Sequence, residues 1–492
     1  MQSSQGRHTA ALCGWVIVLV VLLPSLILQT PDLHFGPALA LQCVVVAHSG
    51  GALTKVLTAE SVRLVALGFW LFAYVWLGLA PLAMLATDAY PLAYRAGQTT
   101  AFAATALTEL GLLAYSAGAA FAARRADRRS VVLEPLLSRT LAPVPVLLLC
   151  GLSLALAAWL IPQQGGVEPY FTSREAARLE GVDSDSERVL RAWILSVTAF
   201  WALLALMHLV RLPSGDRLLR GLRWMLLPLL VAVNVVVNNP ISKPRFWAGT
   251  VLLALLFASA RFSTPRAFRI TAAALTTVVL LMFPYSDYFR YDERETLRAV
   301  ALTEMFTSNM DYDAYQQMQT GLDYVHETGF SPSAALGPAL FMVPRSVWPD
   351  KPQDTGGLIA QYAGYEFQNL SAPLWIETYQ WAGAPSVVVA FWLLGVGGRR
   401  MDDIRARLGN RQATLAALII PGLAFYQMIV LRGGLMAIAG PLLLLLTIPL
   451  FITTRAAARA FRFPSPSLPP ATAGPLPSQE QEAIHDQPHR IR

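Results

Sequence analysis

Arginines in the polar segments between apolar stretches are the residues best suited to chemistry. A guanidinium group can donate two parallel hydrogen bonds to a phosphate, so several arginines around one cavity suit a phosphate or diphosphate ligand. We expect five cationic residues to contact such a group: Arg245, Arg290, Arg345, Lys351 and Arg432. The alternative for each is an ion pair with a nearby carboxylate or an anchor to lipid headgroups.

Glu377 is the first choice for a general base. It lies beside Trp375 in an otherwise apolar stretch, and removal of water from a carboxylate raises its proton affinity. A base with raised proton affinity is useful near neutral pH. Asp287 is the second choice, and the alternative role for Glu377 is to hold a structural arginine such as Arg345 or Arg432.

The stretch 343–352 contains three prolines and also carries Arg345, Trp348 and Lys351. Proline fixes its own φ angle and restricts the residue before it. We therefore expect a rigid, extended strand that holds these three side chains at low entropic cost. A stiff connection between helices is the alternative.

Metal and cofactor chemistry is not expected. The pairs Asp183/Asp185 and Asp311/Asp313 match a short D-x-D pattern, but such pairs arise often by chance. The cysteines are widely separated, without metal-ligand spacing. Glu109 lies within an apolar run and needs a polar partner there, most simply on a neighbouring helix.

Composition indicates the elements that must position these residues. The chain has 492 residues, of which 55% are apolar and 14% charged, whereas soluble domains carry about 25% charged residues. The apolar residues gather in runs of about 20, the length that spans a bilayer core. These features predict an all-α polytopic membrane protein and exclude a soluble enzyme.

Twelve membrane spans are predicted, with one large polar insert between the ninth and the tenth. The spans are 11–29, 35–53, 62–86, 98–122, 141–161, 189–210, 218–237, 246–261, 268–286, 374–398, 412–431 and 434–453. The chain then divides into a bundle of nine spans (1–286), an extracytoplasmic loop with the candidate site (287–373), three further spans (374–453) and a disordered cytoplasmic tail (454–492).

Basic residues set the expected orientation. The loops 123–140, 211–223, 261–269 and 399–411 hold 17 Lys and Arg residues, against four in the segments 87–97, 238–245 and 432–433. Cytoplasmic loops carry the excess of positive charge, so both termini are expected in the cytoplasm and the insert outside. Basic residues placed this way explain the net charge of +7 without a nucleic-acid partner.

Four stretches together resemble the oligosaccharide repeat-unit polymerase (O-antigen polymerase) family of bacterial surface-polysaccharide systems. They are Asn239-Pro240 with Arg245, the segment 283–290, Pro344-Arg345 with 348–352, and Glu377-Thr-Tyr with Gly383. Arg432-Gly433 also fits. Members often carry Asp or Ser next, where this chain has Gly434.

The resemblance implies a metal-independent glycosyltransferase of GT-C-like architecture in the cytoplasmic membrane of a bacterium. Such an enzyme joins polyprenyl-diphosphate-linked oligosaccharide repeat units into a polysaccharide on the outer face of the membrane. The arginines would meet the leaving diphosphate, Glu377 or Asp287 would activate the acceptor hydroxyl, and Trp348 and Tyr379 would stack on sugars. A flippase and a chain-length regulator are the implied partners, and no cofactor is implied.

Three other functions remain open. A flippase or transporter of lipid-linked sugars needs a polar path through the membrane, whereas ionisable residues within the predicted spans are few. A transferase that uses a polyprenyl-phosphate sugar usually has paired acids in its first outer loop, where this chain has only Asp32. A polysaccharide ligase typically has a histidine within a local pattern that is not found around His326.

Overall fold

The computed structural model describes most of the chain up to Arg455. The described residues are 2–125, 130, 132–172, 186–210, 217–241, 243–259, 262, 264–281, 301–367, 370–409 and 413–455. The tail predicted at 454–492 lies outside them beyond Arg455, as do Asp183, Asp185, Asp287 and Arg290.

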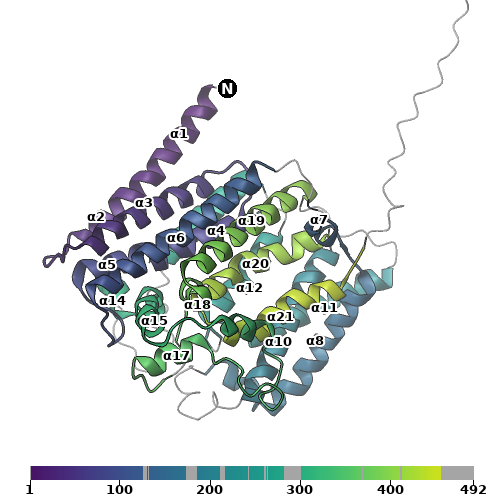
Figure 1. The fold of residues 1–492 in the computed structure, drawn as a ribbon. Helices are drawn as coiled ribbons and strands as arrows, with labels where there is room; N and C mark the ends of the chain where they lie inside the picture. The colour runs from purple at the N-terminus through teal and green to yellow at the C-terminus, as the bar shows by residue number, and fades with distance from the viewer. Residues whose placement is uncertain are drawn as a thin grey trace, which may run out of the picture. The chain divides into compact units, whose positions relative to one another are not determined.

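Helices account for nearly all of the regular structure, so the chain is an all-α protein (Figure 1). The first half contains α1 (Gln2–Val16), α2 (Leu23–Leu28), α3 (Pro37–Leu57), α4 (Leu64–Tyr74), α5 (Ala80–Thr87), α6 (Gln98–Ala123), α7 (Leu133–Leu137), α8 (Pro143–Gln163), α10 (Ser186–Val210), α11 (Arg217–Val237), α12 (Arg245–Ala258) and α13 (Pro265–Leu281). Short π-helical turns, Ile17–Leu22 and Val75–Leu79, join α1 to α2 and α4 to α5.

The second half begins with short helices in the predicted polar insert. These are α14 (Leu302–Ser308), a 3-10 turn η7 (Met310–Tyr312), α15 (Ala314–Thr328), a 3-10 turn η8 (Pro332–Ala335), α16 (Leu336–Ala339) and α17 (Thr355–Tyr362). The chain continues through α18 (Leu374–Ala382), α19 (Ala384–Leu408), α20 (Leu415–Arg432) and α21 (Leu435–Phe451). Thr140–Leu141 (β1) and Thr453–Thr454 (β2) form a two-residue antiparallel ladder.

Eight helices among the described residues are long and apolar enough to cross a membrane. They are His8–Leu28, Pro37–Leu57, Leu64–Thr87, Gln98–Ala123, Pro143–Gln163, Arg188–Val210, Leu219–Val237 and Leu415–Arg432. Helices α12 and α21 are apolar but shorter. The chain is therefore an all-α membrane protein with eight candidate spans, and the count of twelve stays a prediction.

The predicted tenth span, 374–398, is wrong as one continuous helix. Gly383 interrupts it with φ 74° and ψ −155°, which ends α18 and starts α19. Only glycine adopts such a backbone conformation readily. Pro385 then occupies the first turn of α19, where its missing N–H costs no hydrogen bond.

Close approach of helices holds the bundle together. A Cβ atom at Gly118 would lie 2.1 Å from the carbonyl oxygen of Trp392, and one at Gly395 would lie 2.1 Å from that of Tyr115. Glycine at these positions lets α6 and α19 touch backbone to backbone, a common way of packing membrane helices. Gly68 does the same for α4, since its Cβ would lie 1.9 Å from the carbonyl oxygen of Ala424 on α20.

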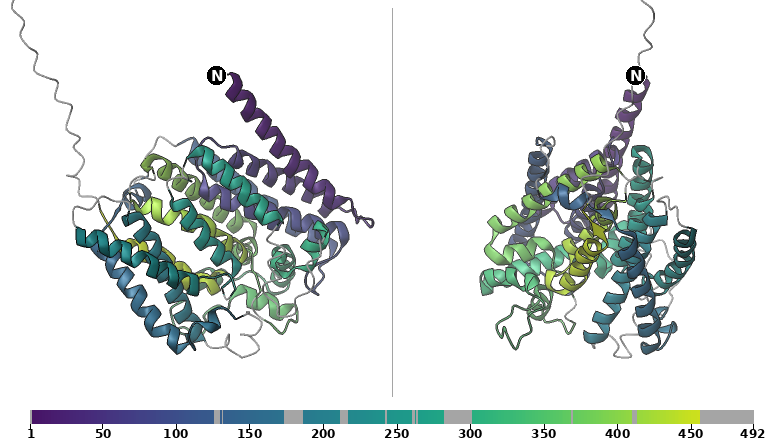
Figure 2. Two further views of the ribbon diagram at one scale, coloured as in Figure 1. Left: turned by 180° about the vertical axis from the view of Figure 1, so that it is seen from behind. Right: turned by 90° about the vertical axis from the view of Figure 1, so that its right-hand side faces the viewer.

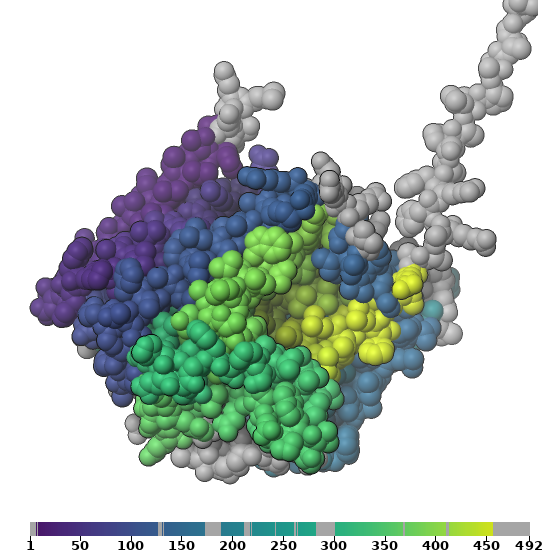
Figure 3. Space-filling model, viewed as in Figure 1, coloured from purple at the N-terminus to yellow at the C-terminus, as the bar shows by residue number. Residues whose placement is uncertain are grey.

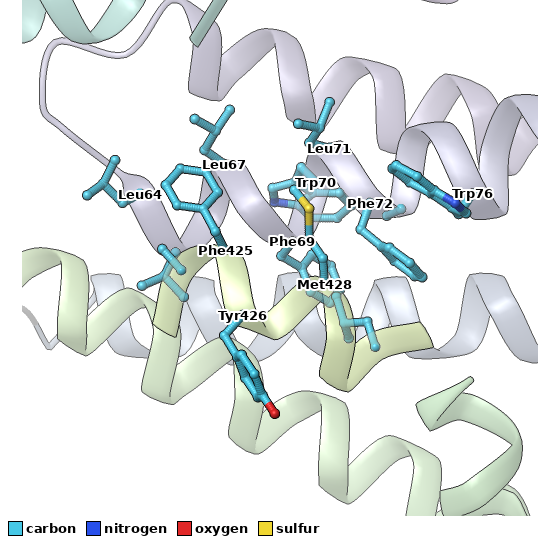
Figure 4. Close-up of a cluster of buried hydrophobic side chains, with 14 of the residues drawn as sticks. Leu64, Leu67, Phe69, Trp70, Leu71, Phe72, Trp76, Phe425, Tyr426 and Met428 are labelled. Carbon is cyan, nitrogen blue, oxygen red and sulfur yellow. The ribbon is translucent and has the colours of Figure 1, made fainter. Parts of the chain in front are cut away.

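The core between α4 and α20 is strongly aromatic. Figure 4 shows Phe69, Trp70 and Phe72 of α4 facing Phe425 and Met428 of α20, and all five side chains are buried. Phe69 stacks on Tyr115 of α6 at a centroid distance of 3.5 Å. By contrast, α1 extends beyond the other helices in both views of Figure 2.

The connecting segments gather at two ends of the bundle. At one end, the β1–β2 ladder joins the start of α8 to the end of α21, and the N–H of Leu415 donates to the carbonyl of Arg139. At the other end, Leu92 bonds Gln316, Asn239 bonds the carbonyl of Tyr170, and Ser371 pairs with Gly433. Segments predicted to share a side of the membrane therefore meet, while the side that each end faces stays a prediction.

Candidate functional site

Two predicted diphosphate ligands, Arg245 and Arg432, meet through a pair of aspartates. Arg245 begins α12 and its Nη1 donates to Asp311 Oδ2 at 2.8 Å. Arg432 ends α20 and its Nη2 donates to Asp313 Oδ1 at 3.0 Å, with Asp311 Oδ1 at 3.9 Å. The order of charges is therefore Arg245, Asp311, Arg432, Asp313. We call these four side chains the arginine–aspartate cluster.

The arginine–aspartate cluster is largely withdrawn from solvent. Asp313 is only 3% exposed at its side chain and Arg432 22%. Burial raises the pKa of Asp313, while the charge of Arg432 and a hydrogen bond with Ser371 act in the opposite direction. Breaking one partner of a buried ion pair leaves an uncompensated charge. The cluster therefore depends on all of its members.

Arg432 retains hydrogen-bonding capacity beyond its aspartates. Its Nη2 also reaches the carbonyl of Met310 at 3.3 Å, and its guanidinium carbon lies 5.5 Å from the ring centroid of Phe246. Its Nε is buried and finds no acceptor among the described residues. A buried donor without a partner is costly, and Arg432 Nε is such a donor.

Glu377, the predicted base, is a residue of α18. Its carboxylate binds the first residue of α21 rather than an arginine. The N–H of Leu435 donates to Glu377 Oε2 at 2.9 Å and to Oε1 at 3.1 Å. The first N–H groups of a helix have no partner within the helix and favour negative charge. Leu435 begins α21 only three residues after Arg432 ends α20. The hydrogen bond with Leu435 therefore places Glu377 near the arginine–aspartate cluster.

The surroundings of Glu377 shift its proton affinity as the sequence predicted. The residue is 3% exposed and lies in α18, outside the eight candidate spans. Burial raises the pKa of Glu377 to about 8, and the charge of Asp354 acts in the same direction. Hydrogen bonds with Leu435 and Thr355 act in the opposite direction. A carboxyl of this kind can exchange a proton near neutral pH.

Asp354 is a second carboxylate at the same helix start, and the sequence analysis missed it. Its side chain accepts from the N–H of Ala437 at 3.3 Å and, as the N-cap of α17, from that of Gly357 at 3.4 Å. Burial raises its pKa. An Asp directly before Thr-Gly-Gly is a recognisable helix start, but nothing local in the sequence connects it with α21.

Gly434 provides the space for Asp354. A Cβ atom at this position would lie 2.4 Å from Asp354 Oδ1. The glycine that departs from the pattern of the resembling family therefore has a structural explanation here, because a larger residue would displace the carboxylate.

The predicted extended strand at 343–352 is wrong, since the segment forms consecutive turns. The carbonyl of Pro344 accepts from the N–H groups of Val347 and Trp348, both at 3.0 Å, and that of Trp348 accepts from Lys351 at 3.1 Å. Proline fixes φ near −65°, which fits the first position of a turn as well as an extended chain. Proline fixes φ but not ψ, so the three prolines did not determine whether the segment turns or extends.

Arg345 and Lys351 bind the backbone of their own loop. Arg345 Nη1 donates to the carbonyl of Lys351 at 2.8 Å, and Lys351 Nζ donates to the carbonyls of Phe341 and Val343. Arg345 is exposed and its described contacts do not reach the arginine–aspartate cluster. Of the five predicted diphosphate ligands, the structure thus joins Arg245 and Arg432, while Arg290 lies outside the described residues.

The predicted sugar-stacking residues differ in their surroundings. Tyr379 packs edge-to-face against Phe330 at a centroid distance of 5.7 Å, so its ring already has an aromatic partner within the protein. Trp348 is half-buried in the turns that follow Pro344. Asp287, the second choice for the base, lies outside the described residues.

Metal binding at Asp311/Asp313 has no support in the described part of the chain. Both carboxylates pair with arginines, and no group of three or more His, Cys, Asp or Glu side chains with metal-binding geometry occurs among the described residues.

Glu109 has the inter-helix partner that the sequence predicted. Its Oε1 lies 2.7 Å from His48 Nδ1, while His48 Nε2 lies 3.1 Å from Ser116 Oγ. This pair connects α3 with α6 in the apolar interior.

Comparison of the chain with protein-family models, with curated proteins and with solved structures gave no match.

Proposed function

We propose that the protein is a metal-independent glycosyltransferase that joins polyprenyl-diphosphate-linked oligosaccharide repeat units into a polysaccharide. The observation that carries the proposal is the proximity of two kinds of group at one end of the bundle. The arginines of the arginine–aspartate cluster suit a diphosphate. Leu435, three residues after Arg432, donates to the buried carboxyl of Glu377, and the pKa of about 8 lets that carboxyl exchange a proton near neutral pH.

A surface hollow between two helices that pack against α20 suits the lipid part of such a substrate. Helices α19 and α21 each pack against α20, and Figure 3 shows the surface hollowed between light-green α19 and yellow α21. Several exposed side chains on the two helices are apolar, among them Val389, Leu393, Leu443 and Leu446. An isoprenoid chain in this hollow would bring its diphosphate towards the ends of α18 and α20.

The chemical step follows from these positions. Glu377 takes the proton from the acceptor hydroxyl as the hydroxyl oxygen attacks the anomeric carbon of the donor. The bond between that carbon and the diphosphate oxygen breaks, and the diphosphate leaves on its lipid with both electrons of the bond. Arg432 and Arg245 stabilise the added negative charge, which requires the aspartates to share their guanidinium groups with the ligand.

The implied setting is the outer face of the cytoplasmic membrane of a bacterium, with a flippase that supplies the lipid-linked units and a chain-length regulator as partners. The site would then lie on the side to which flipped substrate is delivered. Accessibility labelling of loop cysteines in intact cells tests this orientation, because labelling of 301–367 only after lysis would contradict it.

Reconstitution in detergent tests the activity. Purified protein with lipid-linked repeat units should give a ladder of products, and Glu377→Gln should abolish the ladder. Glu366→Gln changes an exposed carboxylate in the same insert and should leave it intact. Absence of a ladder with the unchanged protein, together with transbilayer movement of the substrate in vesicles, would instead identify a flippase.

A further inference from the structure

The segment 330–348 exposes an unusual number of large apolar side chains. Phe330, Leu336, Leu340, Met342 and Val347 are 56%, 52%, 45%, 71% and 74% exposed. A contiguous exposed apolar surface marks a site of interaction rather than a water-facing loop. This segment belongs to the insert that was predicted to be polar and extracytoplasmic.

The same segment packs against the first half of α21. A Cβ atom at Gly337 would lie 2.8 Å from Met436 Cε, and one at Gly440 would lie 3.7 Å from Phe341. Helix α21 has no charged residue over its 17 positions and exposes Leu443 and Leu446. Figure 3 shows the insert in contact with yellow α21. The apolar surface of the segment therefore adjoins that of an apolar helix.

Several backbone groups of the segment are hydrogen-bonded within this part of the chain. The N–H groups of Leu340 and Val343 donate to the carbonyls of Leu336 and Leu340, both at 2.9 Å. Lys351 Nζ binds the carbonyls of Phe341 and Val343. Non-helical backbone tolerates an apolar environment only when its polar groups are satisfied in this way.

We propose that residues 330–348 lie in the lipid headgroup–acyl boundary beside α21, with Met342 and Val347 inserted among the acyl chains. The occupant of this surface is the bilayer, because the surface adjoins α21 and places an exposed arginine, Arg345, next to its apolar side chains. Interfacial segments combine these two features, with the cation at the level of the lipid phosphates. The proposal requires neither the glycosyl transfer nor a particular sidedness.

Site-directed fluorescence in lipid nanodiscs tests this placement. Met342→Cys and Val347→Cys each receive an environment-sensitive nitrobenzoxadiazole label, in a full-length chain in which Cys13, Cys43 and Cys150 are replaced by Ala. Gln361→Cys, an exposed polar position on α17, is the matched control. Since only inserted labels contact lipid, quenching by phospholipid with a doxyl group near the ester end should be at least roughly twofold stronger at 342 and 347 than at 361.

Equal quenching of all three labels by aqueous iodide would overturn the proposal. Labels protected in native membranes but iodide-accessible in nanodiscs of phospholipid alone would also overturn it, because the occupant would then be a protein. If Met342→Cys does not elute as a single species, Leu340→Cys takes its place. Leu340 lies on the same segment and is 45% exposed.

Discussion

Two buried carboxylates each bind N–H groups at the start of a neighbouring helix, at opposite ends of the bundle. Their electrostatic surroundings differ. Asp402 of α19 accepts the N–H groups of Val65 and Ala66 at 3.1 and 3.2 Å, at the start of α4. Glu377 does the same for α21 through Leu435. Each is 3% exposed.

The charges around these carboxylates are opposite in sign. Burial raises the pKa of Asp402 to about 6, against the charges of Arg405 and Arg63, which favour its ionised form. Burial raises the pKa of Glu377 further, to about 8, and the carboxylate of Asp354 acts in the same direction. One geometry therefore serves two purposes. Asp402 caps a helix and is the more easily ionised of the two carboxyls, whereas Glu377 keeps its proton to a higher pH.

The largest expected effect comes from exchanging each carboxylate for its amide. Gln at 377 keeps an oxygen that can accept from Leu435 but cannot take a proton, so Glu377→Gln should slow polymer formation by about 10²–10⁴-fold, the usual contribution of a general base. Asp402→Asn should retain turnover per folded molecule and lower the melting temperature. In vitro ladder formation and thermal unfolding measure the two effects. Full activity of Glu377→Gln would contradict the role of Glu377 as a base and leave it only the role of capping α21.

Removal of a buried guanidinium should affect stability more than removal of an exposed one. Arg432→Ala leaves Asp313 buried without its cation and should cost about 3–5 kcal/mol in free energy of unfolding. Arg407→Ala breaks a pair with Glu134 at the other end, where Arg407 is 36% exposed, and should cost about 1 kcal/mol or less. Unfolding in mixed detergent and SDS measures both. Similar losses of unfolding free energy in the two variants would show that Arg432 is not the buried partner of Asp313.

The raised pKa of Glu377 also predicts how stability depends on pH. The folded state binds a proton at Glu377 up to about pH 8, whereas an unfolded Glu releases it near pH 4.3. Stability from this group is therefore complete below the lower pKa and is lost as pH rises through the higher one, at up to about 1.4 kcal/mol per pH unit. Glu377→Gln should remove this contribution, as thermal unfolding at pH 5 to 8 can show. The polymerisation rate of the unchanged protein should rise over the same interval.

The smallest effect should come from the neighbouring carboxylate. Asp354→Asn removes the negative charge that raises the pKa of Glu377, so the pH–rate profile should move to lower pH by less than about one unit. Asp350→Asn, a change in the exposed loop, should leave the profile in place. A shift to higher pH in Asp354→Asn would contradict the assigned influence of Asp354.

Local patterns were sufficient for much of the fold. Apolar runs located the helices. Glu134 and Arg407, in two loops predicted from their basic residues to share a side of the membrane, form an ion pair. The interruption at Gly383 was readable, because Gly383 followed by Pro385 is typical of one helix ending and another beginning. The prediction instead followed hydropathy alone, which does not change across this point.

The site was less predictable because its contacts join distant parts of the chain. Glu377 was chosen from its apolar neighbours, yet its partner is a backbone N–H 58 residues away. Asp354 approaches Ala437 across 83 residues. The ion pairs of Arg245 and Arg432 were among the stated alternatives, but only the packing of α12, α15 and α20 determines which aspartates they meet.

The glycine contacts between α6 and α19 affect how mutational screens of this chain should be interpreted. Gly118 and Gly395 have no side chain to react or bind, yet any replacement collides with the opposite backbone. Random mutagenesis scored by loss of the proposed product will therefore report these positions as strongly as the proposed catalytic ones. Surface abundance must be scored in parallel to separate failed assembly from failed chemistry.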